Sequence, residues 1–237
     1  VIAVAANSHG YFHSWKQMAG KITALKLQKK NKERVNIYLD GRYAFSLAAT
    51  LAARLKQGQV LSEEEIERLL AEDVFHKAYE QALRFLSYRP RSQMEVRRYL
   101  RGKKVSPPVE DKVVERLTDA GLLDDLTFAR YWVENRENFN PRSLSMLRYE
   151  LRNKGLSEEI IALVLGERDE EESAYALALK RASRLSHLDY PTFRSKVTPY
   201  LRRRGFPYEV LNTAVKRAWQ EVHGEGAAIL EDAVDDN

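Results

Sequence analysis

Three stretches of the chain share one pattern of apolar and basic positions. Leu100, Leu151 and Leu201 each follow a proline by ten residues and an apolar residue by four, and an arginine comes directly after each leucine. The three leucines are 51 and 50 residues apart. Apolar positions at helical spacing with a period of about 50 residues predict a tandem helical array, in which each unit buries its apolar face against itself and its neighbours.

Each unit is expected to hold three helices. The predicted ranges are 74–87, 91–101 and 107–120 in the first unit, 125–137, 142–153 and 158–165 in the second, and 170–185, 191–203 and 208–222 in the third. Gly155 and Gly205 lie where the middle helix must end, because glycine tolerates the left-handed conformation there. In the first unit Lys104 occupies this position, and the middle helix is expected to end near Leu100. Pro199 predicts a kink or a late start in the third unit.

Before the repeats, residues 22–47 alternate between apolar and polar positions, which predicts antiparallel strands. Asp40-Gly41 lies between two alternating runs and predicts a two-residue hairpin. The apolar members of these runs are Val35, Ile37 and Leu39, then Tyr43, Phe45 and Leu47, with Thr23, Leu25 and Leu27 as a third strand. A capping box at Ser62 and Glu65 begins a leading helix that is expected to run to about Leu86, with a break near Asp73.

The expected fold class is mainly α: three tandem three-helix repeats, elongated and curved, with a small N-terminal antiparallel β-hairpin or meander. The expected parts are residues 1–20, a disordered extension; 21–60, the β meander; 61–123, repeat 1 with its leading helix; 124–166, repeat 2; 167–223, repeat 3; and 224–237, an acidic tail. Met18 is expected to be a natural start, so that residues 1–17 precede it.

Composition points to a soluble, cytoplasmic protein with a polyanionic partner. The 237 residues are 44% hydrophobic and 31% charged, and no apolar run reaches the length of a membrane span. The absence of cysteine excludes disulfides and thiolate chemistry. The net charge is +5 although residues 224–237 hold five acidic and no basic residues, so +10 remains on the body. The tail is either a competitor for the polyanion's surface or an ordinary solvated terminus.

Basic residues gather where the middle helix of each unit ends. Near a helix C-terminus such cations complement the dipole, which accounts for one or two charges per unit but less well for three adjacent arginines. The alternative is a surface that binds a long polyanion. The candidate binding residues are Arg97, Arg98, Arg101, Lys103 and Lys104 in the first unit, Arg148, Arg152 and Lys154 in the second, and Arg194, Lys196, Arg202, Arg203 and Arg204 in the third.

Signals of catalysis are weak. The histidines lack zinc-ligand spacing, and no phosphate-binding or dinucleotide-binding glycine motif occurs, so we predict no catalytic residue, metal site or cofactor. An acidic run at a predicted helix start is expected to compensate the helix dipole; it comprises Glu167, Asp169, Glu170, Glu171 and Glu172. The aromatic stripe Phe128, Tyr131 and Trp132, like Trp219, is expected to be core.

Several phrases together resemble the RecX family, regulators of the bacterial RecA recombinase. These are Tyr88-Arg89-Pro90-Arg91-Ser92 with Glu95, Gly121-Leu122-Leu123-Asp124-Asp125 with Phe128-Ala129-Arg130, and Leu151-Arg152-Asn153-Lys154-Gly155-Leu156. The resemblance implies a monomeric, non-enzymatic inhibitor that lies in the groove of the RecA–DNA filament and modulates ATP hydrolysis and strand exchange, with RecA and DNA as partners. Three alternatives stay open: a protein that binds DNA without a recombinase, a scaffold between proteins, and an enzyme with a cryptic site.

Overall fold

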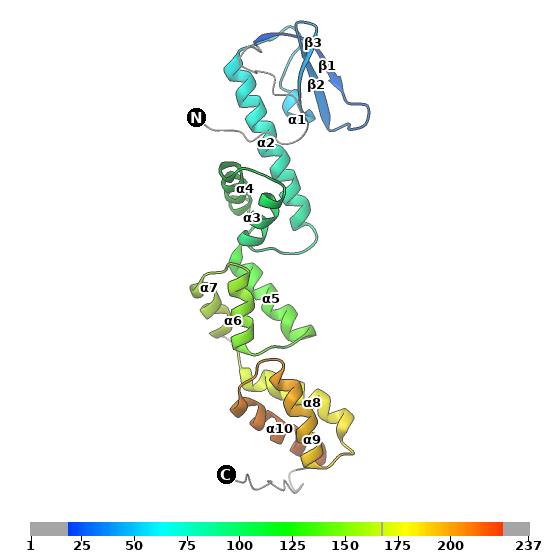
Figure 1. The fold of residues 1–237 in the computed structure, drawn as a ribbon, viewed down its shortest axis with the longest axis vertical. Coiled ribbons are helices and arrows are strands. Elements are labelled where there is room, and N and C mark those ends of the chain that lie inside the picture. The colour runs from blue at the N-terminus through cyan, green and yellow to red at the C-terminus, as the bar shows by residue number, and fades with distance from the viewer. Residues whose placement is uncertain (1–18, 167, 225–237) are drawn as a thin grey trace. The chain divides into compact units, whose positions relative to one another are not determined.

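A computed structural model describes residues 19–166 and 168–224 (Figure 1). These residues form two compact units, which are divided between Leu123 and Asp124. Residues 1–18 of the predicted N-terminal extension and residues 225–237 of the acidic tail lie outside the described residues. The predicted end of the extension at residue 20 is wrong, because Gly20 is the first residue of β1. In the described ranges no helix is long and apolar enough to cross a membrane.

The first unit begins with an antiparallel sheet in the order β3-β2-β1-β4. Its strands are β1 (Gly20–Leu27), β2 (Arg34–Leu39), β3 (Arg42–Ala48) and β4 (Val60–Leu61). The predicted hairpin is confirmed, because Asp40 and Gly41 connect β2 to β3 with φ angles of 47° and 82°. Strand β4 was not predicted, since two residues are too few to carry a periodic pattern.

Two irregularities in the sheet lie on either side of Tyr38. The register passes from Ile37 opposite Phe45 to Tyr38 opposite Tyr43, so Ala44 is an extra residue in β3. In β1, Thr23 is extra in the same way. Such bulges re-aim side chains, and here Tyr43 joins Tyr38 on the outer face while Phe45 stays in the core. The expectation that Tyr43 and Phe45 share the apolar face of one regular strand is therefore wrong.

The sheet is followed by α1 (Ala49–Ala52) and by the long helix α2 (Glu63–Leu86). The predicted capping box is confirmed, with the Ser62 hydroxyl accepting from the Glu65 N–H and the Glu65 carboxylate accepting from the Ser62 N–H. The break expected near Asp73 is wrong, because α2 continues through it. The buried Asp73 carboxylate instead accepts hydrogen bonds from Arg34 (2.8 Å) and from the N–H of Ala48 (2.7 Å), which ties α2 to the sheet.

Helix α2 contributes to two hydrophobic cores. Ile66, near its start, packs with the sheet residues. Ala78 and Ala82, near its end, pack with the core of the first repeat. In Figure 1 the helix accordingly extends from the sheet to α3 and α4.

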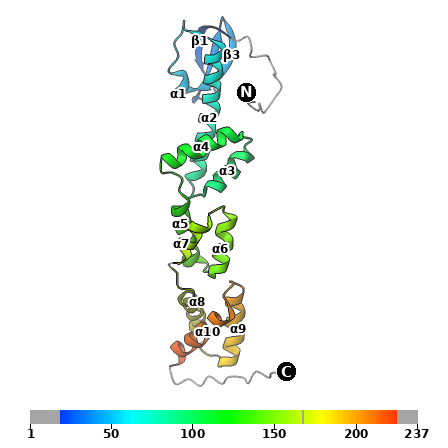
Figure 2. The same cartoon turned by 90° about the vertical axis from the view of Figure 1, so that its left-hand side faces the viewer.

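The mainly helical, three-repeat fold is confirmed, and Leu100, Leu151 and Leu201 are each fully buried in the core of their own repeat. Figure 2 shows the three groups of helices from a second side. After α2 the helices are α3 (Gln93–Gly102), α4 (Pro107–Asp119), α5 (Asp125–Phe139), α6 (Leu144–Asn153), α7 (Glu158–Gly166), α8 (Glu170–Leu185), α9 (Tyr190–Arg202) and α10 (Tyr208–His223).

The ends of the middle helices share one backbone geometry. Gly155 and Gly205 have φ angles of 82° and 86°, as the predicted stop requires. Lys104 has φ 62°, so the first repeat keeps the left-handed residue without the glycine. Helix α3 runs to Gly102, two residues beyond the predicted end. Pro199 lies inside α9, which begins at Tyr190 and so does not start late.

Candidate nucleic-acid interface

In the first repeat, two of the candidate arginines bind one buried carboxylate. Arg101 donates two hydrogen bonds to Glu110, from Nε (2.9 Å) and Nη2 (3.0 Å). Arg97 donates to Glu110 (3.1 Å) and to Asp111. The hydrogen bond to Asp111 is the main reason why the pKa of Arg97 is raised above its ordinary value. Because the Glu110 side chain is only 2% exposed, these arginines balance a charge inside the protein.

The second repeat repeats this arrangement at its surface. Arg148 (3.0 Å) and Arg152 both bind Glu158, the first residue of α7. The hydrogen bond from Arg152 is the main reason why the pKa of Glu158 is lowered, and that from Arg148 acts in the same direction. Glu158 is 53% exposed, so water screens this cluster.

The third repeat lacks such a carboxylate. Within the described part of the chain, no ion pair holds Arg202, Arg203 or Arg204, and the first two are exposed. Arg204 lies over the ring of Tyr200 at 3.8 Å and donates to the carbonyl oxygen of Tyr200 (3.2 Å). Tyr208 stands where repeat 2 has Glu158, and its hydroxyl accepts a hydrogen bond from Arg194 (3.4 Å). The third repeat therefore exposes arginines whose charge no neighbour neutralises.

The other candidate lysines and arginine are surface residues of mixed character. Lys103 lies 5.6 Å from the centre of the Tyr99 ring, and Lys154 lies 4.4 Å from the ring of Trp132. Arg98, Lys104 and Lys196 are exposed.

Trp132 corrects part of the prediction for the aromatic stripe. Phe128 is buried as expected, and so is Trp219. Trp132 is only partly buried, donates from Nε1 to Glu150 (2.8 Å), and has the guanidinium of Arg136 4.7 Å from its ring centre. The indole packs against the core of the repeat, as predicted, but it also lies near cations at the surface, which a helical period of apolar residues does not reveal.

The end of α9 meets the start of α6. The N–H of Ser143 donates to the carbonyl oxygen of Arg204 (3.0 Å), and Arg142 donates to that of Arg203 (3.5 Å). A Cβ atom at Gly205 would lie 2.4 Å from Met146 Cγ and 2.6 Å from Ser143 Oγ. Gly205 is thus needed for this close approach as well as for its backbone conformation, a second role that sequence analysis missed.

The acidic run at the start of α8 has structural roles. The Asp169 carboxylate accepts from the N–H of Glu172 and caps the helix, as predicted. Glu170 accepts from the N–H of Leu144 (2.7 Å), and Glu172 binds Arg217 (2.8 Å). Among the described residues, no group of three His, Asp or Glu side chains could hold a metal ion.

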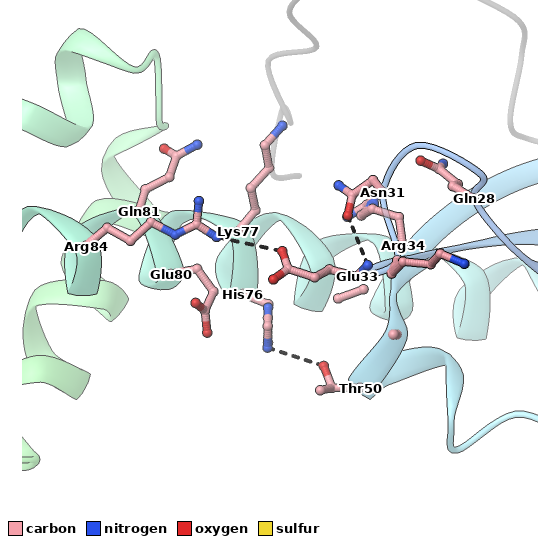
Figure 3. A pocket seen from close by; sticks show the side chains of 13 residues that line it. Gln28, Asn31, Glu33, Arg34, Thr50, His76, Lys77, Glu80, Gln81 and Arg84 are labelled. Atoms are coloured by element: carbon pink, nitrogen blue, oxygen red, sulfur yellow. Dashed lines mark hydrogen bonds and ion pairs between the residues drawn. The ribbon is translucent and has the colours of Figure 1, made fainter.

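A groove of about 690 Å³ lies in the first unit between the β1–β2 turn and α2 (Figure 3). Two of its charged groups bind each other, with Arg84 Nη2 3.7 Å from Glu33, and Arg34 pairs with Asp73, which lies outside the groove lining. His76 lies 3.3 Å from the hydroxyl of Thr50, with no carboxylate of the described residues hydrogen-bonded to its ring. The groove is polar, and no activated nucleophile is assembled there.

Three-helix repeats that follow an N-terminal antiparallel sheet define a helical-repeat protein. Models of the RecX family match almost the whole described chain: the regulatory protein RecX N-terminal domain at residues 20–62, and its first, second and third three-helix domains at 78–117, 124–165 and 169–215. The chain belongs to the RecX family of regulatory proteins.

Individual relatives agree with this assignment. Regulatory protein RecX of Listeria welshimeri is 34% identical over 207 residues, which cover 85% of this chain and 77% of the relative. That of Bacillus subtilis is 35% identical over 199 residues, covering 82% and 75%. Among solved structures, a crystal structure of regulatory protein RecX is 30% identical with a TM-score of 0.64, covering 84% of this chain and all of the other. RecX from Lactobacillus salivarius is 27% identical with a TM-score of 0.54, covering 62% and 97%.

Proposed function

We propose that this chain is a non-enzymatic, cytoplasmic inhibitor of the RecA recombinase that binds in the groove of the RecA–DNA filament. Membership of a family of regulatory proteins supports a regulatory role. The observation that carries the proposal is the run Arg202-Arg203-Arg204 at the end of α9, which has no carboxylate partner in the described ranges. Unpaired arginines attract phosphates and acidic side chains, both of which a protein–DNA filament offers.

The backbone contacts at the end of α9 indicate that these arginines are not needed only to compensate the helix dipole. The carbonyl oxygens of Arg203 and Arg204 accept hydrogen bonds from Arg142 and from the N–H of Ser143. Donors from α6 therefore already satisfy part of the negative end of α9. The charge on Arg202 and Arg203 is left available to a ligand.

The first two repeats contribute differently to the proposed surface. Arg97, Arg101, Arg148 and Arg152 are engaged by Glu110 and Glu158. Their net field is weaker than the sequence alone indicates, because each pair of cations shares a carboxylate. The exposed Arg98, Lys103 and Lys104 of the first repeat and Lys196 of the third are the additional contacts that we propose.

The proposed mechanism is occupation of the groove, so that the filament hydrolyses ATP and exchanges strands more slowly. Capping of a growing filament end is an alternative mechanism, and the stoichiometry of inhibition distinguishes it from groove occupation. The experiment is RecA's DNA-dependent ATP hydrolysis with this protein added at sub-stoichiometric and at equimolar ratios. Inhibition that saturates near equimolar protein supports groove binding, and inhibition far below it supports end capping. No effect at either ratio would refute the proposal.

The contribution of the third repeat is tested by changing Arg202, Arg203 and Arg204 to Ala together. We expect weaker inhibition and filament binding with helicity preserved. The melting temperature should fall only slightly, because Arg202 and Arg203 are exposed and Arg204, which packs on the Tyr200 ring, is only partly buried. The matched control is Arg148→Ala with Arg152→Ala, which removes cations that Glu158 already neutralises. An equal loss of inhibition in the control would contradict the special role of the third repeat.

A salt titration separates this function from direct DNA binding. Affinity for naked DNA that falls steeply with salt and does not change when RecA is present would favour a DNA-binding protein without a recombinase partner. Affinity for the filament well above that for either component favours the regulator.

A further inference from the structure

The outer face of the N-terminal sheet presents two tyrosines side by side. Tyr38 in β2 and Tyr43 in β3 are opposite each other in the register, with ring centres 6.0 Å apart and planes at 78°. Tyr43 is 57% exposed and Tyr38 is partly exposed. Exposed aromatic rings on a sheet are the usual platform on which proteins stack unpaired bases.

A cation extends this platform across the sheet. Lys26 in β1 has its Nζ 5.1 Å from the centre of the Tyr38 ring. Asn36, opposite Lys26, accepts a hydrogen bond from the Gln28 side chain (2.8 Å). Strand β3 therefore presents Tyr43, and β1 presents Lys26. Strand β2 between them presents Tyr38 and Asn36, and amide groups such as that of Asn36 can hydrogen-bond to base edges.

The surroundings carry the charge that a nucleic-acid backbone requires. Residues 19–48 contain seven basic and two acidic residues, among them Lys29, Lys30 and Lys32 in the turn after β1. Gln28 and Lys32 also line the groove of Figure 3, to which Lys77 of α2 adds a further cation. The sheet that carries the tyrosines and the turn between β1 and β2 therefore have an excess of positive charge, which attracts a polyanion.

The bulges explain why the platform exists at all. In a regular strand, Tyr43 would have the same orientation as Phe45 and would enter the core. The extra residue Ala44 places Tyr43 beside Tyr38 instead. The extra residue Thr23 in β1 connects this strand to the β2–β3 hairpin. Its hydroxyl donates to the carbonyl oxygen of Tyr38 (3.2 Å) and accepts from the N–H of Gly41 (2.9 Å). The local structure therefore holds both rings in place before any ligand arrives.

We propose that this face, formed by Tyr38, Tyr43 and Lys26, is a binding site for single-stranded nucleic acid, in which bases stack on the tyrosines and Lys26 contacts phosphate. Duplex DNA does not suit the site, because its bases are already stacked on one another and their faces are not available to the tyrosine rings. The site does not depend on the recombinase, so it can be tested in its absence.

The test is binding of the full chain to a fluorescein-labelled dT oligonucleotide and to a duplex of equal length, by anisotropy. Tyr43→Ala should weaken binding to the single strand by about tenfold, with a smaller effect on the duplex. Tyr43→Phe keeps the ring and should bind as the unchanged protein does. Tyr88→Ala removes an even more exposed tyrosine from another part of the chain and is the matched control. Lys26→Gln should lower the dependence of log affinity on log salt by about 0.7.

A second readout locates the contact directly. Photocrosslinking with dT oligonucleotides that carry 5-bromodeoxyuridine, followed by mass spectrometry, should identify Tyr38 or Tyr43 as the modified residue. Crosslinks found only in the repeats, or equal losses for Tyr43→Ala and Tyr88→Ala, would overturn the site. If Tyr43→Ala lowers affinity for the RecA filament but not for the single strand, the face binds protein and the proposal is wrong. Since RecA is absent from the first measurements, their failure leaves the inhibition experiment unaffected.

Discussion

The N–H of Ser143 donates to the carbonyl oxygen of Arg204 at 3.0 Å, which joins the start of α6 to the end of α9. The contact is possible because the residue after Arg204 is a glycine with φ 86° and no side chain. The helix stop of the third repeat is therefore also the place where the second and third repeats touch.

Gly205→Ala should destabilise the protein by more than the ordinary cost of a left-handed alanine, which is about 1–2 kcal/mol. The added Cβ would stand 2.4 Å from Met146 Cγ. Gly121→Ala is the matched control, because Gly121 also has a positive φ but nothing lies within 4 Å of its Cβ position. Urea-induced unfolding measures both. Equal losses would show that the contact with α6 is not stabilising, and Met146→Ala should restore part of the loss if it is.

The two arginine pairs should differ in their effect on stability. Arg97→Ala with Arg101→Ala leaves Glu110 buried without a cation, and we expect a loss of about 3 kcal/mol. Arg148→Ala with Arg152→Ala leaves Glu158 in water, and we expect little change. Thermal unfolding of the two double variants compares them directly. A first variant as stable as the second would show that the two arginines are not needed to offset the burial of the Glu110 carboxylate.

Asp124 should make the second unit sensitive to acid. Its carboxylate caps α5, and the hydrogen bond from the Thr127 hydroxyl is the main reason why its pKa is lowered from the ordinary value of 3.8. Because the unfolded chain binds this proton more tightly, the stabilisation is complete above pH 3.8 and is lost as the pH falls through the lower pKa of the folded state.

The measurement for Asp124 is the urea midpoint as a function of pH. Asp124→Asn keeps a capping oxygen but cannot titrate, so the decline of the midpoint at acidic pH should be shallower in the variant. Profiles of equal slope would place the acid sensitivity in other carboxylates.

Lys104→Gly should stabilise the first repeat. Lys104 has φ 62°, and glycine relieves the strain of a left-handed side chain at the expense of unfolded-state entropy, for a net gain of about 0.5–1 kcal/mol. Lys104→Ala removes the same charge and keeps the Cβ, so it should bring no gain. A gain in both variants would assign the effect to charge repulsion with Lys103 and Arg101.

The repeats were predictable because their information is periodic. Leu100, Leu151 and Leu201 are buried in equivalent places, and burial repeats with the helices. The partners of the arginines are not periodic: Glu110 is the fourth residue of α4, whereas Glu158 is the first of α7. Only the packing of the helices shows that both carboxylates lie close to the arginines of the middle helix. The sequence alone therefore could not distinguish arginines that pair with a carboxylate from arginines that remain available to a ligand.

The face of Tyr43 illustrates a second limit of the sequence. Alternation in β3 is read by counting residues, and one extra residue reverses every assignment beyond it. Ala44 carries no mark of its being extra, because its side chain suits either face. Similarly, Asp73 reads as a charge inside a helix, and only its contact with Arg34 and Ala48 explains why it is buried there without ending the helix.

The continuity of α2 limits how this protein can be divided into separate domains. The matched family domains end at residue 62 and resume at 78, which invites a cut between them. Helix α2 runs through that interval and supplies Ile66 to one core and Ala82 to the other. A chimera that exchanges the sheet with that of a relative must therefore carry the whole helix, and the two domains should melt as one cooperative body rather than in sequence.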